Sequence, residues 1–118
     1  MAAIIGLDDD DVRKLCQENA ADEVLQAVNY NAPGQVVVAG SASAVGRLVD
    51  NAKAAGAKRA LQLPVSVPSH CALMQPASDR MSERLKEVTI SKAQVPVIHN
   101  VNVQTASAEE QVRQLLAR

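Results

Sequence analysis

Apolar residues in the first half of the chain recur with two spacings, one typical of strands and the other of helices. Four short apolar runs predict β-strands, at residues 2–7, 24–30, 35–39 and 58–63. Spacings of three and four residues predict two helices, with Val12, Leu15 and Cys16 on the apolar face of one and Val45, Leu48, Val49 and Ala52 on the other. The order β-α-β-β-α-β is the split βαβ, or ferredoxin-like, pattern of an α+β fold with a four-stranded antiparallel sheet.

Residues between these elements support their boundaries. Asp8 to Asp11 supply an N-cap and negative charge for the first helix. Residues 32–35, Ala-Pro-Gly-Gln, indicate a turn, because proline sets φ and glycine accepts positive φ. Ser41 is placed to cap the second helix, and Gly56 is placed to end it.

The pattern changes after Leu63, where Pro64 and Pro68 indicate an extended, irregular passage. The later elements are a helix with Pro76 in its first turn, a strand-like run at 95–103, and a last helix after a capping box at 107–110. We therefore divide the chain into a compact unit, residues 1–63, and a looser segment, residues 64–118. The sequence stops within a helix pattern, so we expect a fragment of a longer protein.

Composition narrows the functional classes. The 118 residues are 47% hydrophobic and 21% charged, and the net charge of −1 offers no strong field for nucleic acid. Tyr30 is the only aromatic residue, so stacking on bases is nearly excluded. No run has membrane-spanning length and no leader is evident, so we expect no membrane contact and a cytoplasmic location. Cys16 and Cys71 form no close pair, which argues against a metal site.

The stretch LPVSVPSHCALM, residues 63–74, holds one of the two histidines of the chain. Histidine is the side chain whose unperturbed pKa suits proton transfer near neutral pH, so His70 is a candidate proton shuttle on a backbone that the flanking prolines restrict. The simpler interpretation is a histidine whose imidazole is satisfied by a backbone carbonyl at a loop edge. The residues alone leave both interpretations open.

A general base needs a nucleophile within hydrogen-bond reach, and the sequence offers no convincing one. Ser69 precedes His70, but neighbours in an extended chain point to opposite faces. Ser41 lacks the G-x-S-x-G context of a nucleophile elbow, and helix capping explains it better. Cys71 is expected to pack, and His99, in a strand-like run, is expected to be structural.

Three stretches carry a resemblance to a known family: VNYNAPGQVVVAG at 28–40, GAKRALQLPVSVPSHCALM at 56–74 and VPVIHNVNV at 95–103. They resemble the malonyl-CoA:acyl carrier protein transacylases of bacterial type II fatty-acid synthesis. The resemblance covers essentially the whole chain. It is specific because the runs N-x-N-S/A-P-G-Q and P-V-S-x-x-S-H-x-x-L-M occur together.

The resemblance implies an acyltransferase in which a ferredoxin-like small subdomain is inserted into an α/β-hydrolase-like large subdomain. Residues 1–63 would be the small subdomain and residues 64–118 a partial segment of the large one. The implied site is His70 as catalytic base, with Asn31, Ser66 and Val67 lining the substrate cleft and Asn29 and Asn100 supporting it. Malonyl-CoA and the phosphopantetheine thiol of acyl carrier protein would be substrates, so no cofactor is implied.

The family's G-H-S-x-G serine, its malonate-binding arginine and its oxyanion loop match nothing in this sequence. We therefore expect the isolated chain to be inactive in acyl transfer and to self-associate through apolar faces that would otherwise be covered. The basic pair Lys58 and Arg59 is a candidate contact for an acidic carrier protein. The alternative function is that of a stand-alone ferredoxin-like binding or interaction module.

Overall fold

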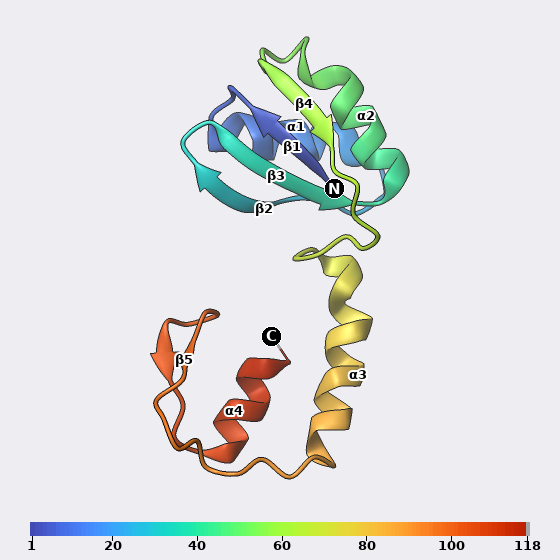
Figure 1. Cartoon of the computed structure of the whole chain (residues 1–118). Coiled ribbons are helices and arrows are strands. Elements are labelled where there is room, and N and C mark those ends of the chain that lie inside the picture. The colour runs from blue at the N-terminus through green and yellow to red at the C-terminus, as the bar shows by residue number, and fades with distance from the viewer. Residues whose placement is uncertain (118) are drawn as a thin grey trace. The chain divides into compact units, whose positions relative to one another are not determined.

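The computed structural model describes residues 1–117, which form two compact units (Figure 1). The first unit is Met1–Met74, and the second begins at Gln75. The two units thus meet after Met74, eleven residues later than the boundary between residues 63 and 64 that the sequence predicted. The subdomain boundary stays a prediction, because contacts within one chain do not show how a longer chain is divided.

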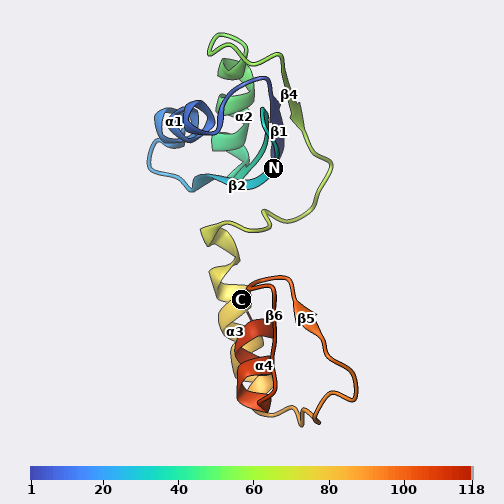
Figure 2. The same cartoon turned by 90° about the vertical axis from the view of Figure 1, so that its left-hand side faces the viewer.

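The first unit is an antiparallel sheet with two helices against it (Figure 2). The strands β1 (Ala2–Ile5), β2 (Leu25–Ala32), β3 (Gln35–Gly40) and β4 (Arg59–Gln62) lie in the order β2-β3-β1-β4. Helix α1 (Asp9–Ala20) connects β1 to β2, and helix α2 (Ala42–Ala52) connects β3 to β4. The α+β class, the order of these six elements and the four-stranded antiparallel sheet are confirmed.

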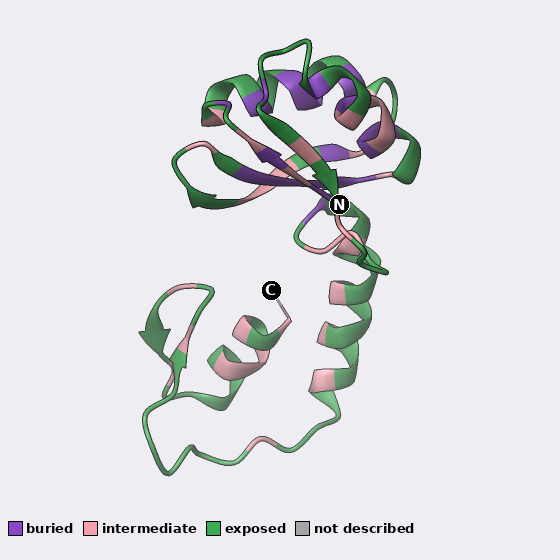
Figure 3. Cartoon of the chain, turned by 45° about the horizontal axis from the view of Figure 1, so that its top comes forward, coloured by how far each residue is buried: buried purple, intermediate pink, exposed green. Residues whose placement is uncertain are grey.

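The hydrophobic core lies between the sheet and the two helices (Figure 3). Alternate residues of the central strands are fully buried, namely Ala2, Ile4, Val36 and Val38. They pack with the apolar faces of the helices, formed by Val12, Leu15, Cys16, Ala44, Val45, Leu48 and Ala52. The burial of Cys16 on its helix face is confirmed. The helical spacing in the sequence therefore identified the surface that stabilises this unit.

Strand β2 pairs with β3 through a short turn at Pro33 and Gly34, where Gly34 has φ +73°. Leu25 lies opposite Gly40, and Gln26 lies opposite Ala39. A Cβ atom on Gly40 would lie 2.1 Å from the Val24 carbonyl oxygen. The start of β2 therefore approaches the end of β3 so closely that only glycine fits there.

Three predicted helix caps are wrong in their side-chain contacts. Asp8 and Ser41 occupy the N-cap positions of α1 and α2, but neither side chain makes a capping hydrogen bond. Their backbone carbonyls accept the N–H groups of Val12 and Val45 instead, both at 3.0 Å. The last helix begins at Glu109 with Ala108 at the N-cap, so Ser107 lies one position too early for the predicted capping box.

The second unit pairs helix α3 (Gln75–Lys86) with helix α4 (Glu109–Leu116). Arg113 of α4 donates to the carbonyl oxygens of Leu85 and Val88 at 3.0 and 3.1 Å, which caps the end of α3. The strand-like run 95–103 was predicted too long. Only β5 (Ile98–His99) pairs, with β6 (Gln104–Thr105), because the chain reverses between them and Val103 has φ +56°.

One short helical segment completes the described elements. The 3-10 helix η1 (Ala72–Met74) ends the first unit, directly before α3, in which Pro76 lies in the first turn as expected. No helix of residues 1–117 is both long enough and apolar enough to cross a membrane.

Candidate active site

The candidate base His70 lies in a tight turn of the first unit. Its φ of +66° is uncommon for a residue other than glycine, although histidine adopts this region more often than most side chains. The preceding Ser69 N–H donates to the Val67 carbonyl oxygen at 3.0 Å. The expectation of an extended chain at Ser69 and His70 is therefore wrong, because the backbone turns here.

The imidazole of His70 is exposed and makes no hydrogen bond within residues 1–117. The Ser69 hydroxyl likewise makes no hydrogen bond to it among the described residues. The sequence also allowed an imidazole that is hydrogen-bonded to a backbone carbonyl at a loop edge. Among the described residues, no backbone carbonyl accepts a hydrogen bond from His70. An exposed, unpaired imidazole on a tight turn can accept a proton from an approaching hydroxyl or thiol.

Two contacts hold the turn that carries His70. Cys71 is buried, and its Sγ donates to the Pro68 carbonyl oxygen at 3.1 Å, which agrees with the expectation that Cys71 packs. The Ala72 N–H donates to Oε1 of Gln26 on β2 at 2.9 Å. Sequence inspection missed Gln26, since no local pattern links two residues 46 positions apart.

The two asparagines expected at the site lie on β2. Asn29 is half-buried and Asn31 is exposed. At about 3.3 Å per residue, Asn31 lies roughly 16 Å along the strand from Gln26, where the His70 turn is attached. No hydrogen bond joins Asn31 to His70 among the described residues, and the His70 turn is attached to β2 at Gln26 instead.

Asn31 lines a surface hollow with Tyr30, Arg13 and the first acidic residues of α1. Arg13 donates to the Tyr30 hydroxyl at 3.2 Å, and its guanidinium lies over the ring, 5.6 Å from its centre. The Tyr30 hydrogen bond and then the Asp10 carboxylate raise the pKa of Arg13 above its ordinary value. This cation beside Asn31 was also missed from the sequence.

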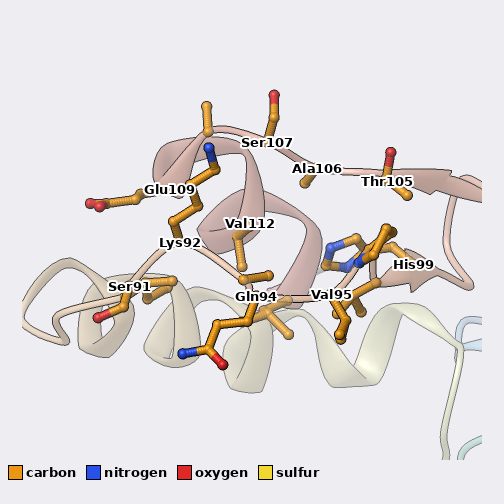
Figure 4. A pocket seen from close by; sticks show the side chains of 16 residues that line it. Ser91, Lys92, Gln94, Val95, His99, Thr105, Ala106, Ser107, Glu109 and Val112 are labelled. Atoms are coloured by element: carbon orange, nitrogen blue, oxygen red, sulfur yellow. The ribbon is translucent and has the colours of Figure 1, made fainter.

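The remaining predicted site residues are dispersed. Ser66 and Val67 are exposed in the passage after β4. Asn100 is exposed in the second unit, at the start of the turn that follows β5. His99 lines a hollow of about 460 Å³ in that unit, together with Val95, Thr105 and Val112 (Figure 4). The structural interpretation of His99 stays a prediction.

Within the described residues, no group of three or more His, Cys, Asp or Glu side chains could hold a metal ion. Cys16 is also poorly suited to nucleophilic chemistry, because burial raises the pKa of its thiol to about 11. Among the groups described above, the exposed imidazole of His70 is the one best placed for proton transfer.

The first unit thus combines a mixed α+β fold with a solvent-facing histidine on a tight turn. Comparison with known families makes this specific. The family model described as "Acyl transferase domain" matches residues 1–117, and the chain belongs to this family.

Within the family, the chain is similar to malonyl CoA-acyl carrier protein transacylases, which confirms the resemblance identified from its motifs. It is 52% identical over 118 residues to the transacylase of Salmonella typhimurium strain LT2, covering 100% of this chain and 38% of that protein. The structure of an acyl carrier protein S-malonyltransferase from Vibrio cholerae matches with a TM-score of 0.82 and 50% identity, covering 99% of this chain and 38% of that one.

A second similar structure is that of a malonyl-transacylase in complex with a type II polyketide synthase acyl-carrier protein. It matches with a TM-score of 0.85 and 48% identity, covering 99% of this chain and 38% of that one. The chain thus spans about 38% of the length of these relatives. The alternative of a stand-alone binding module is not favoured by these matches.

Proposed function

We propose that this chain is the part of a malonyl-CoA:acyl carrier protein transacylase that carries the general base, His70. The observation that carries the proposal is the exposed, unpaired imidazole at φ +66°, within a chain that matches the acyl transferase family over residues 1–117. The nucleophilic serine would come from sequence outside these 118 residues. We also propose that the protein is cytoplasmic, and this proposal rests on the resemblance alone.

His70 would act twice in the transfer. It first accepts the proton of the serine hydroxyl while the serine oxygen attacks the malonyl thioester carbon. The imidazolium then gives this proton to the departing sulfur, so coenzyme A leaves as the thiol and the imidazole is neutral again. It then accepts the proton of the phosphopantetheine thiol, whose sulfur attacks the acyl-serine ester. The serine oxygen leaves and regains a proton from the imidazolium. Both steps are proton transfers and acyl transfers, so no cofactor is needed.

The first unit supports a finer assignment, that of the ferredoxin-like small subdomain over residues 1–63. The order β-α-β-β-α-β, the antiparallel strand order β2-β3-β1-β4 and the shared core of α1 and α2 favour it. Residues 64–118 would then be a partial segment of the large subdomain. Asn31, Ser66 and Val67 would contact the substrate, and Asn29 and Asn100 would support the site.

A chimeric enzyme tests this function directly. The matching stretch of the Salmonella relative is replaced by this chain, with which it shares 52% identity. Transfer of labelled malonyl from coenzyme A to holo-carrier protein is then measured. We expect transfer by the chimera and a loss of about 10²- to 10⁴-fold in His70→Ala, because this is the usual contribution of a positioned general base.

His99→Ala is the matched control, because it removes the other histidine of the chain. It should transfer malonyl within a few-fold of the unsubstituted chimera. Equal rates in the His70→Ala chimera and its parent would contradict the proposal. The 118-residue chain by itself should give no transfer above the background without enzyme, because it has no G-H-S-x-G serine.

We propose that acyl carrier protein docks near Lys58 and Arg59, since acyl carrier proteins are acidic. Both residues are exposed, at the start of β4. Titration of the ¹⁵N-labelled chain with carrier protein should shift the amide resonances of both residues at low salt and lose this effect at high salt. Lys53, an exposed cation after α2, is the control site. Equal shifts at all three residues would contradict the docking site.

Self-association of the isolated chain is a further proposal. Ile98 and Val103 in the second unit are 68% and 78% exposed, which is unusual for large apolar side chains near one another. Light scattering should show a mass that rises with concentration. A constant monomer mass at high concentration would contradict self-association.

A further inference from the structure

Gln26 is the residue of the sheet that holds the turn carrying His70. Leu25 is buried in the core between the sheet and the helices. Successive residues of a strand point to opposite faces, so Gln26 points to the face away from α1 and α2. Its Oε1 accepts the Ala72 N–H there at 2.9 Å. The His70 turn is thus attached to the open face of the sheet.

The Ala72 N–H is a group that needs a partner. Ala72 is the first residue of η1, and the first N–H groups of a helical segment have no partner within it. The Gln26 side chain, from strand β2, therefore supplies the acceptor that an N-cap side chain would otherwise provide. Ala72 lies two residues after His70, so the cap fixes the backbone next to the imidazole.

Few other contacts restrain this segment. After the Leu63 N–H, which donates to the Met1 carbonyl oxygen, the backbone hydrogen bonds of residues 64–74 are local turns. Cys71 is buried, and Ala39, opposite Gln26 on β3, is fully buried although its side chain faces away from the helices. The cap by Gln26 thus lies where the turn contacts the sheet, while His70 itself stays exposed.

We propose that Gln26 is a positioning residue for His70. By accepting the Ala72 N–H it holds the turn in the conformation that presents the imidazole, without touching the substrate. The proposal rests on the proposed role of His70 as the base, because positioning matters only if the imidazole acts.

The test compares Gln26→Met, which keeps the length and loses the acceptor, with Gln26→Glu, which keeps an acceptor. NMR spectra of the 118-residue chain report the Ala72 amide exchange rate and the Cε1–H signal of the His70 ring. Gln26→Met should speed exchange of the Ala72 amide by about two- to tenfold, the value of one ordinary hydrogen bond, and move the His70 signal. Gln26→Glu should restore both. Gln62→Met, at an exposed position on the other edge strand, is the control and should change neither.

Superimposable His70 signals in Gln26→Met and the unsubstituted chain would overturn the proposal. So would failure of Gln26→Glu to restore them while the amides of the central strand β3 stay protected, because the change at His70 would then not come from loss of the acceptor for the Ala72 N–H. These measurements do not use acyl transfer. An inactive chimera would therefore overturn the proposed function alone, and an unmoved His70 signal would overturn the positioning role alone.

Discussion

Replacing Arg47 with Met should destabilise the first unit by about 2 kcal/mol. Arg47 lies on α2 and donates through Nε to the Asn19 carbonyl oxygen and through Nη2 to the Ala20 carbonyl oxygen, both at 3.0 Å. These carbonyls end α1, which has no basic residue in its own last turn. Arg47 therefore places a cation at the negative end of α1 and joins the two helices.

The magnitude follows from the two carbonyl contacts. A hydrogen bond from a charged donor contributes about 1.5–3 kcal/mol when fully buried. The Arg47 side chain is 40% exposed, so water screens each bond and we count about 1 kcal/mol for each. Its contact with the exposed Glu23 carboxylate is left out of this sum. Methionine keeps the apolar stem, so little packing is lost.

Tyrosine fluorescence during urea unfolding measures this loss in the first unit, because Tyr30 is the only aromatic residue. We expect the midpoint to fall by about 1 M urea and the melting temperature by roughly 10 °C. Lys53→Met, which removes an exposed cation at the end of α2, is the control. A midpoint for Arg47→Met that equals the control would refute the reasoning, as would a difference that vanishes in 0.5 M salt, about the strength that screens surface pairs.

Three further predictions concern other parts of the first unit. Gly40→Ala should prevent β2 and β3 from keeping their register, because the added Cβ would meet the Val24 carbonyl oxygen at 2.1 Å; a native-like amide spectrum would contradict this. Cys16 should resist a thiol reagent at pH 8 until the chain unfolds, because it is buried and the pKa of its thiol is about 11; rapid labelling of the folded chain would count against it. Hydrogen bonds from Ser43 and then Arg47 lower the pKa of Glu23, so its stabilising effect is present above the ordinary carboxylate pKa and lost as the pH falls through the lowered value. Glu23→Gln should therefore flatten the acid limb of the stability curve, and an unchanged limb would show that the carboxylate has no such effect.

The sequence predicted the fold of the first unit because its apolar residues repeat with the period of each element. Val12 and Leu48 were assigned to the apolar faces of the helices by spacing alone, and both are fully buried. Helix starts were also located within a residue or two. The capping contacts of Asp8 and Ser41 were not predictable, because a suitable side chain at the cap position does not fix its rotamer.

The candidate site was predictable only in part. The motif identified His70, but the flanking prolines suggested extended chain, whereas the backbone turns to φ +66°. Gln26 and Arg13 were missed because each acts through a contact with a distant segment, at separations of 46 and 17 residues. Such contacts depend on the register of the sheet, which no local pattern contains.

The attachment of His70 to the first unit has a consequence for how the base is held. All residues of the core cluster lie between Ala2 and Ala57, whereas the described residues of the second unit include no buried side chain. Rigidity in a small protein comes from its buried core, because opening the core costs the most free energy. The resemblance assigns the His70 segment to the large subdomain, but its contacts attach it to the sheet at Gln26. A substitution that loosens the core of the first unit, such as Leu48→Ala, should therefore also loosen the His70 turn, although the two sites lie on opposite faces of the sheet.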